Sequence, residues 1–226
     1  MAPTVSKRIK TLSVSRPIIY GNTAKKMGSV KPPNAPAEHT HLWTIFVRGP
    51  QNEDISYFIK KVVYKLHDTY PNPVRSIEAP PFELTETGWG EFDINIKIYF
   101  VEEANEKVLN FYHRLRLHPY INPLSNSTNG NEQDTTNHNG KDAEVSSVYF
   151  DEIVFNEPNE DFFRILMSRP GNVLPSNKTD SCVYSKQLEQ EEIDRIKIGI
   201  VKVDKEIDEL KQKLENLVKQ EAIDGS

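Results

Sequence analysis

The chain has 226 residues, of which 37% are hydrophobic, enough for one domain of about 150 to 170 residues with an appendage but not for two full domains. Its formal net charge of −5 argues against nucleic-acid binding through bulk electrostatics, so no direct, sequence-specific nucleic-acid contact is expected. A single cysteine, Cys182, excludes a disulfide framework, and the apolar runs are too short for a membrane span or a secretory signal, so no membrane partner is expected.

The first part of the chain predicts two strands and a loop. Lys7 to Tyr20 alternates loosely and is broken by Pro17, which favours an interrupted edge strand. Asn22 to Ala37 contains three prolines and predicts a long loop. His41 to Arg48 has apolar residues on both faces, which is typical of a central strand.

Four further runs have the composition or alternation of strands, namely Ile55 to Leu66, Phe92 to Phe100, Leu109 to Leu117 and Val148 to Phe155. Turn residues separate them, and no regular alternation of strands with helices is present. We therefore predict an all-β fold, an antiparallel β-sandwich of about eight strands.

Two polar stretches interrupt this pattern. Residues 122–147 are rich in Asn, Ser, Thr, Gly and Asp and predict a mobile insertion between two strands. Asn159 is a candidate N-cap for a short helix that ends near Met167, with apolar residues that pack on one end of the sandwich.

The end of the chain has the clearest periodicity. After a linker at 169–185, residues 186–222 predict a helix with four heptads of apolar residues, typical of a coiled coil. The a positions are Ile193, Ile200, Ile207 and Leu214, and the d positions are Ile196, Val203, Leu210 and Leu217. Pairing with a second copy, pairing with another protein, and packing back onto the sandwich all remain open.

Two loop segments combine residue types that suit ligand binding, Leu66 to Pro73 and Glu86 to Phe92. The first ends in Pro-Asn-Pro, which makes a rigid ledge. The second places an indole between two glycines, where the backbone can adopt positive φ and a ligand can approach the main chain. The side chains or positions of interest are His67, Thr69, Tyr70, Gly88, Trp89 and Gly90.

Flat rings beside hydroxyl and amide donors suit a planar, neutral hydrogen-bond acceptor, such as the amide of an acylated lysine. The rings alone would also attract an ammonium group through cation–π forces. A donor-only ammonium would, however, leave the Thr69 hydroxyl and the N–H groups near Trp89 without an acceptor. Each buried donor left without an acceptor costs about 1–3 kcal/mol. Taken singly, Tyr70 and Trp89 are better explained by packing in the core, since a buried Trp or Tyr is more often a core residue than a ligand contact.

Four ordered motifs resemble the YEATS family: His41 to Pro50, Leu66 to Pro73, Glu86 to Phe92 and Phe155 to Phe162. The resemblance covers residues 6 to about 168 and implies an immunoglobulin-like sandwich. The whole chain, with its coiled-coil tail, is similar to the fungal YEATS subunit shared by a histone acetyltransferase complex and a histone-variant exchange remodeller.

The resemblance also implies a site. An aromatic sandwich of Tyr70 and Trp89 is expected to hold the acyl-lysine amide, and Gly88 and Gly90 are expected to shape the turn. Thr69 matches a serine or threonine that hydrogen-bonds the acyl group. The other positions expected to line the site are His39, His67 and Phe92.

The expected function is that of a non-enzymatic reader in the nucleus. Its expected partners are acetylated or longer acylated histone tails, those of histone H3 first, and subunits of chromatin-modifying complexes that bind the coiled coil. No cofactor, catalytic residue or metal is expected, since His39 and His41 lack a third ligand at a suitable spacing. The alternatives are an assembly subunit with a vestigial pocket and, more remotely, a small-molecule hydrolase.

Overall fold

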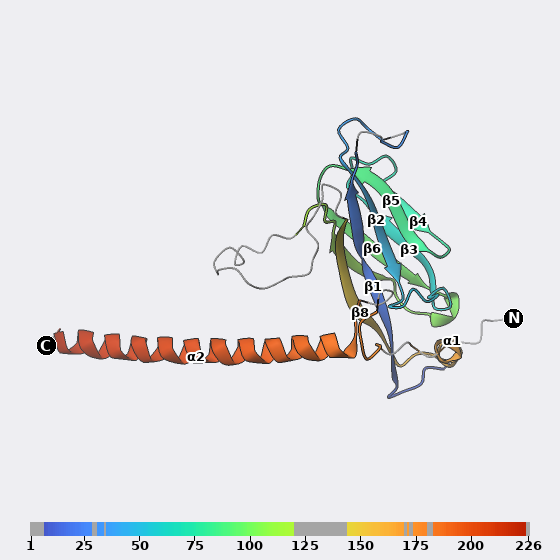
Figure 1. Cartoon of the computed structure of the whole chain (residues 1–226). Helices are drawn as coiled ribbons and strands as arrows, with labels where there is room; N and C mark the ends of the chain where they lie inside the picture. The colour runs from blue at the N-terminus through green and yellow to red at the C-terminus, as the bar shows by residue number, and fades with distance from the viewer. Residues whose placement is uncertain are drawn as a thin grey trace. The chain divides into compact units, whose positions relative to one another are not determined.

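The structure is a computed structural model (Figure 1), and contacts between Cα atoms divide the chain into two compact units, Met1–Asn172 and Val173–Ser226. It describes residues 7–28, 31–33, 35–119, 144–169, 171, 174–179 and 183–224. Most of the predicted insertion at 122–147, and also Cys182, lie outside the described residues.

The first unit is a sandwich of two four-stranded antiparallel sheets, seen as two layers in Figure 1. One sheet has the order β5 (Phe82–Gly88), β2 (His41–Arg48), β1 (Ser13–Lys26) and β8 (Val145–Asn156). The other has the order β4 (Val74–Ile77), β3 (Ile59–Lys65), β6 (Asp93–Phe100) and β7 (Leu109–Arg114). The predicted antiparallel sandwich is confirmed, as is the central place of residues 41–48.

The core lies between the two sheets and follows from the alternation of the strands. One sheet contributes the fully buried Ile94, Ile96 and Ile98 of β6 to this core. The other sheet contributes the buried Trp43 and Ile45 of β2. Successive side chains of a strand point to opposite faces, so every second residue enters the core. The inward residues of the two sheets together bury the apolar surface that stabilises the sandwich.

The first strand differs from its prediction. β1 begins at Ser13, goes on to Lys26 and pairs with both β2 and β8, so it is a central strand. Pro17 does not interrupt it, because the last pair with β2 is Ile19 with Arg48 and Pro17 lies beyond it, with only β8 as a neighbour. The expected loop therefore begins after Lys26 and not at Asn22.

Two further boundaries are shifted. β3 begins at Ile59, since residues 55–58 form a turn in which the Ile59 N–H donates to the Ile55 carbonyl at 3.1 Å. β5 continues to Gly88, which pairs with His41 of β2, so only the second half of the expected loop at 86–92 is loop. Pairing with β2 thus extends β5, whereas the turn at residues 55–58 shortens β3.

The short helix α1 (Glu160–Ser168) is confirmed with its cap. The Asn159 side-chain oxygen accepts a hydrogen bond from the Phe162 N–H at 2.8 Å. The Asn159 amide nitrogen donates to the Glu103 carbonyl at 2.7 Å, in the 3-10 turn η1 (Glu102–Ala104). Phe162 and Leu166 are buried, so α1 packs against the core as expected.

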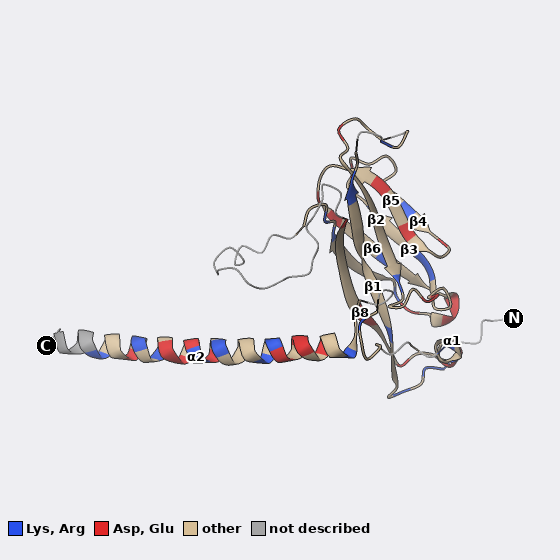
Figure 2. Cartoon of the chain, viewed as in Figure 1, with Lys and Arg blue, Asp and Glu red and all other residues tan. Residues whose placement is uncertain are grey.

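The second unit contains the long helix α2 (Lys186–Asp224), so the chain as a whole is mixed in class and not purely all-β. The Leu188 N–H donates to the Ser185 hydroxyl at its start. All eight heptad residues are 40–64% exposed, while Figure 2 shows charges of both signs along the helix. Whether α2 forms a coiled coil therefore stays a prediction. Within the described ranges, no helix is long and apolar enough to cross a membrane.

Candidate functional site

A cavity of about 460 Å³ opens at the end of the sandwich where β2 begins and β5 ends. The structure brings all eight expected site residues together around it: His39, His67, Thr69, Tyr70, Gly88, Trp89, Gly90 and Phe92. The remaining lining residues are Pro36, Glu38, Pro71 and Glu91. The cavity is thus built by three loops, which precede β2 and follow β3 and β5.

Tyr70 forms the fixed wall of the cavity. Its hydroxyl donates to the Thr87 carbonyl at 2.9 Å, and its ring lies 5.6 Å from that of Phe92 and 6.1 Å from that of Trp43, between ring centroids. Burial raises the pKa of Tyr70, and the neighbouring Trp43 N–H opposes part of that rise. The phenol therefore stays neutral and keeps its orientation.

Gly88 is required for space and not for an unusual backbone angle. A Cβ at Gly88 would lie 2.5 Å from the Tyr70 hydroxyl and 3.1 Å from Trp43 Nε1. Among the described glycines only Gly21 has a positive φ, and its value of 159° is extended backbone. Gly88 and Gly90 therefore do not use the positive φ that glycine permits, and Gly88 continues the extended β5 strand.

Trp89 forms the open wall. Its side chain is 66% exposed, which is unusual for a tryptophan in a domain with a full core. The ring contacts recorded among the described residues join Tyr70 to His39, Trp43 and Phe92 but not to Trp89. Tyr70 and Trp89 line the same cavity without filling it against each other.

Thr69 and His67 form a polar pair on the cavity wall. Thr69 Oγ1 lies 3.0 Å from His67 Nδ1, and the Thr69 N–H donates to the same nitrogen at 3.4 Å. Because Nδ1 accepts from the Thr69 N–H, the ring proton is on Nε2, and the Thr69 hydroxyl donates either to Nδ1 or, after rotation, to a ligand oxygen. The His67 ring also lies 5.9 Å from that of Phe92.

His39 lies opposite Tyr70, with 6.3 Å between ring centroids. Its Nδ1 is 2.7 Å from the Thr87 hydroxyl. Thr87 therefore positions two of the lining residues. Its carbonyl accepts a hydrogen bond from Tyr70, and its hydroxyl forms a hydrogen bond with His39. Thr87 was missed by the sequence analysis, because only the register of β5 shows what its two polar groups face.

Trp43 is a second missed residue. The alternation of residues 41–48 identifies it only as a buried side chain, and it is 1% exposed. In the structure it lies beneath the cavity, where its ring packs edge-on against both Tyr70 and Phe92. It supports the fixed wall from behind.

His39 and His41 do not form a metal site. His39 faces Tyr70, whereas His41 is buried, bonds the Thr40 hydroxyl through Nδ1 at 2.9 Å and lies edge-on to His118. Over the described part of the chain, no three His, Cys, Asp or Glu side chains are placed to hold one metal ion.

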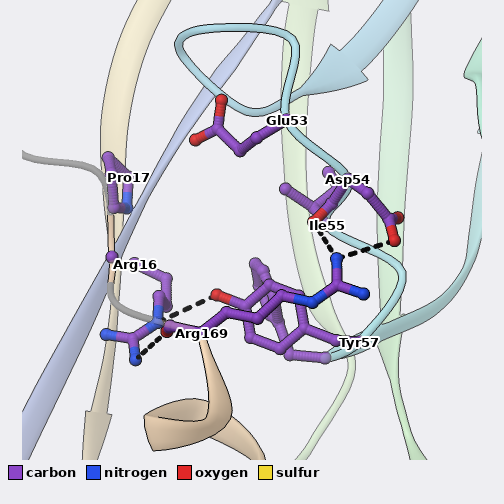
Figure 3. Close-up of a pocket in the computed structure, with 9 residues that line it drawn as sticks. Arg16, Pro17, Glu53, Asp54, Ile55, Tyr57 and Arg169 are labelled. Atoms are coloured by element: carbon purple, nitrogen blue, oxygen red, sulfur yellow. Dashed lines mark hydrogen bonds and ion pairs between the residues drawn. The ribbon is translucent and has the colours of Figure 1, made fainter.

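A smaller cavity of about 210 Å³ lies beside Arg16 and Tyr57 (Figure 3). In this cavity Arg169 pairs with Asp54 at 2.9 Å, and Arg16 Nε donates to the Tyr57 hydroxyl at 3.0 Å. Arg16 also donates to the Leu166 carbonyl at the end of α1. Arg16 thus fastens the last turn of α1 to β1, and we assign this cavity a structural role.

Comparison with known proteins agrees with these features. A family model with the description "YEATS family" matches residues 38–119 of this chain. The chain is 92% identical to "Protein AF-9 homolog" of Saccharomyces cerevisiae (strain ATCC 204508 / S288c) over 226 residues, which cover 100% of both chains. It is 45% identical to the protein of the same name in Schizosaccharomyces pombe (strain 972 / ATCC 24843), over 96% of this chain and 95% of that one.

Two solved structures are also similar. "Crystal structure of the Yaf9 YEATS domain bound to H3K27ac" is 84% identical, covers 72% of this chain and 99% of its own, and superposes with a TM-score of 0.60. "The Yaf9 YEATS domain Recognizing H3K122suc Peptide" is 81% identical, with the same coverage and a TM-score of 0.58. On the full-length identity above and these superpositions, the chain belongs to the YEATS family.

Proposed function

We propose that this protein is a reader of acylated lysine on the tails of histone H3, acting by binding and not by turnover. The similar Yaf9 YEATS domain has been crystallised bound to H3K27ac and recognising an H3K122suc peptide. The observation that carries the proposal is the gathering of all eight expected residues, from three loops, around one open cavity.

The acyl amide enters between Tyr70 and Trp89, whose rings face the flat group from two sides. The amide is planar and neutral, so it stacks on the rings without the desolvation cost of a charge. Its carbonyl oxygen accepts hydrogen bonds from the Thr69 hydroxyl and from main-chain N–H groups at Trp89. An unmodified ammonium has no acceptor and leaves these donors unmatched.

The strength of such a site is modest. Stacking contributes about 0.5–1.5 kcal/mol for each ring, and two or three hydrogen bonds contribute about 1 kcal/mol each. Micromolar affinity already corresponds to about 8 kcal/mol, so we expect a micromolar or weaker Kd. Selectivity in the cell then depends on several contacts made together in one assembly.

Replacing Trp89 with Ala tests the proposal. We expect the affinity for an acetylated H3 peptide to fall by up to about tenfold, because the stacking that the Trp89 ring contributes is lost. Tyr112→Ala is the matched control, since Tyr112 is also an exposed aromatic, at 67%, but lies on β7 outside the cavity. Isothermal titration with acetylated and unmodified peptides is the measurement. Equal affinity of the wild-type protein for both peptides would overturn the proposal.

The helix α2 supports a second role as the means of assembly. Its exposed line of apolar residues favours a helical partner, which we infer to be a subunit of a chromatin-modifying complex in the nucleus. In this proposal residues 6–168 form the reader, 169–185 a linker and 186–222 the docking helix. A chain that ends at Ser185 should keep peptide binding, whereas loss of binding on truncation would favour a pure assembly subunit.

A further inference from the structure

The loop that carries Trp89 has few contacts of its own. The Trp89 side chain is mostly exposed, and a Cβ placed at Gly90 would meet no atom within 4 Å. At its first end the loop is held by Gly88, whose carbonyl accepts from the Thr40 N–H at 3.0 Å. The contacts at the second end of this loop therefore determine the position of the Trp89 indole.

Glu91 holds that end through three hydrogen bonds to one segment. Its Oε1 accepts from the Leu117 N–H at 2.8 Å and from the His118 N–H at 3.2 Å, while its Oε2 accepts from Arg116 at 3.0 Å. Burial raises the pKa of Glu91, but these donors outweigh it and hold the pKa below its usual value. The carboxylate is therefore ionised, and both of its oxygens bind residues 116–118.

The segment that receives Glu91 is itself fixed inside the sandwich. Asn22 of β1 is completely buried, donates to the Arg116 carbonyl at 2.8 Å and accepts from the Arg116 N–H at 3.0 Å. The next residue inward, Leu115, donates its N–H to the Phe92 carbonyl at 2.9 Å. A continuous set of hydrogen bonds thus runs from β1 to the Trp89 loop.

We propose that Glu91 is a positioning residue, which holds the Trp89 loop at the separation from Tyr70 that admits a flat acyl amide. The proposal rests on the proposed acyl-lysine function and adds Glu91 as a residue that acts on the ligand through the position of Trp89. Glu91 lines the cavity beside Trp89, and three of the roughly four acceptor sites of its carboxylate bind residues 116–118.

A direct attraction between Glu91 and a basic peptide is the competing explanation. The two explanations differ in what they predict for added salt and for the free protein. A direct charge contact would weaken with added salt and would leave the free protein unchanged. A positioning role would alter the mobility of Trp89 before any peptide is added, because the loop loses its second anchor.

The test uses the full chain and its two tryptophans, Trp43 and Trp89, whose indole N–H groups give two NMR signals. In Glu91→Ala we expect a lower order parameter for the Trp89 indole and no change for the buried Trp43. Affinity for an acetylated H3 peptide should fall about threefold to tenfold, the share that ring stacking contributes. Arg116→Ala, which removes one of the three bonds, should shift both quantities less and in the same direction.

The matched control is Glu106→Ala. Glu106 is a carboxylate of similar exposure that pairs with Arg8 at 2.9 Å and does not line the cavity. It should leave the Trp89 signal and the affinity unchanged. An unchanged Trp89 signal in both the Glu91 and Arg116 variants, or an affinity loss that disappears in high salt, would overturn the positioning role. Failure of the wild type to prefer acetylated peptide would instead overturn the proposed function, and the indole mobility of the free protein still reports on Glu91.

Discussion

Gly88 and Gly90 flank the same tryptophan, but they differ in what surrounds them. Gly88 lies in β5 against the Tyr70 hydroxyl and the Trp43 indole, both of which are held by other contacts. Gly90 faces open space. The motif contains two identical residues, and only one of them is needed for close packing.

Gly88→Ala should therefore damage the site and Gly90→Ala should not. The added methyl at Gly88 displaces Tyr70, so we expect the affinity for an acetylated peptide to fall by about tenfold or more, with a loss of about 1–3 kcal/mol in the free energy of unfolding. Titration and urea unfolding of both variants measure these quantities. If Gly90→Ala impaired binding as strongly as Gly88→Ala, the assignment of Gly88 by close contact would be incorrect.

At the scale of elements, α1 is held to the sandwich by its two ends. Asn159 caps its start and also bonds η1, while Arg16 of β1 binds the Leu166 carbonyl in its last turn. The apolar face, with Phe162 fully buried, fills the space between them. A helix of nine residues is too short to be stable alone, so these contacts decide whether it forms.

Asn159→Ala should lower the free energy of unfolding by about 1–3 kcal/mol. The variant loses the cap and leaves the buried Phe162 N–H and Ala104 carbonyl without the Asn159 side chain as their partner. Asn156→Ala is a suitable control, because the Asn156 side chain is exposed and accepts a hydrogen bond from the Ser13 hydroxyl on the surface. It should change the stability by less than about 0.5 kcal/mol. Equal effects in urea unfolding would contradict the capping role.

At the scale of the whole molecule, a buried polar contact joins the two sheets. His113 of β7 is 2% exposed and its Nε2 donates to Asn22 of β1 at 2.8 Å. Burial, together with Arg116, lowers the pKa of His113 to about 4, while Asp93 opposes the shift. The imidazole is therefore neutral in the folded protein at neutral pH.

This contact makes stability depend on pH. Below its ordinary pKa near 6.5 the unfolded chain binds a proton at His113 and the folded protein does not, so stability falls from pH 6.5 toward about 4. The lost contribution is ~2 kcal/mol at pH 5. Urea unfolding at pH 7 and pH 5 should show a smaller difference in His113→Gln, which keeps a donor for Asn22 but does not titrate. An unchanged difference would contradict the assignment.

Much of the fold was readable from local patterns. Ile94, Ile96 and Ile98 alternate as a half-buried strand must, and Asn159 precedes a run that needs a cap. β1 was misplaced because a strand's neighbours are not encoded within it: Pro17 is tolerated only because β2 ends before reaching it. Six of the eight site positions followed from the residue types of two segments, and His39 and Phe92 followed from the motif resemblance. Trp43 and Thr87, in contrast, depended on the register between β2 and β5.

The sequence by itself determined the residue types of the cavity, the alternation of the strands and the heptads of α2, because these depend on periods and spacings along one segment. Only the tertiary structure decided that Gly88 is needed for space, that β1 is central, and that Glu91 is bound to residues 25 or more positions away. Such contacts join groups that are distant along the chain, and their geometry is set by how the two sheets pack.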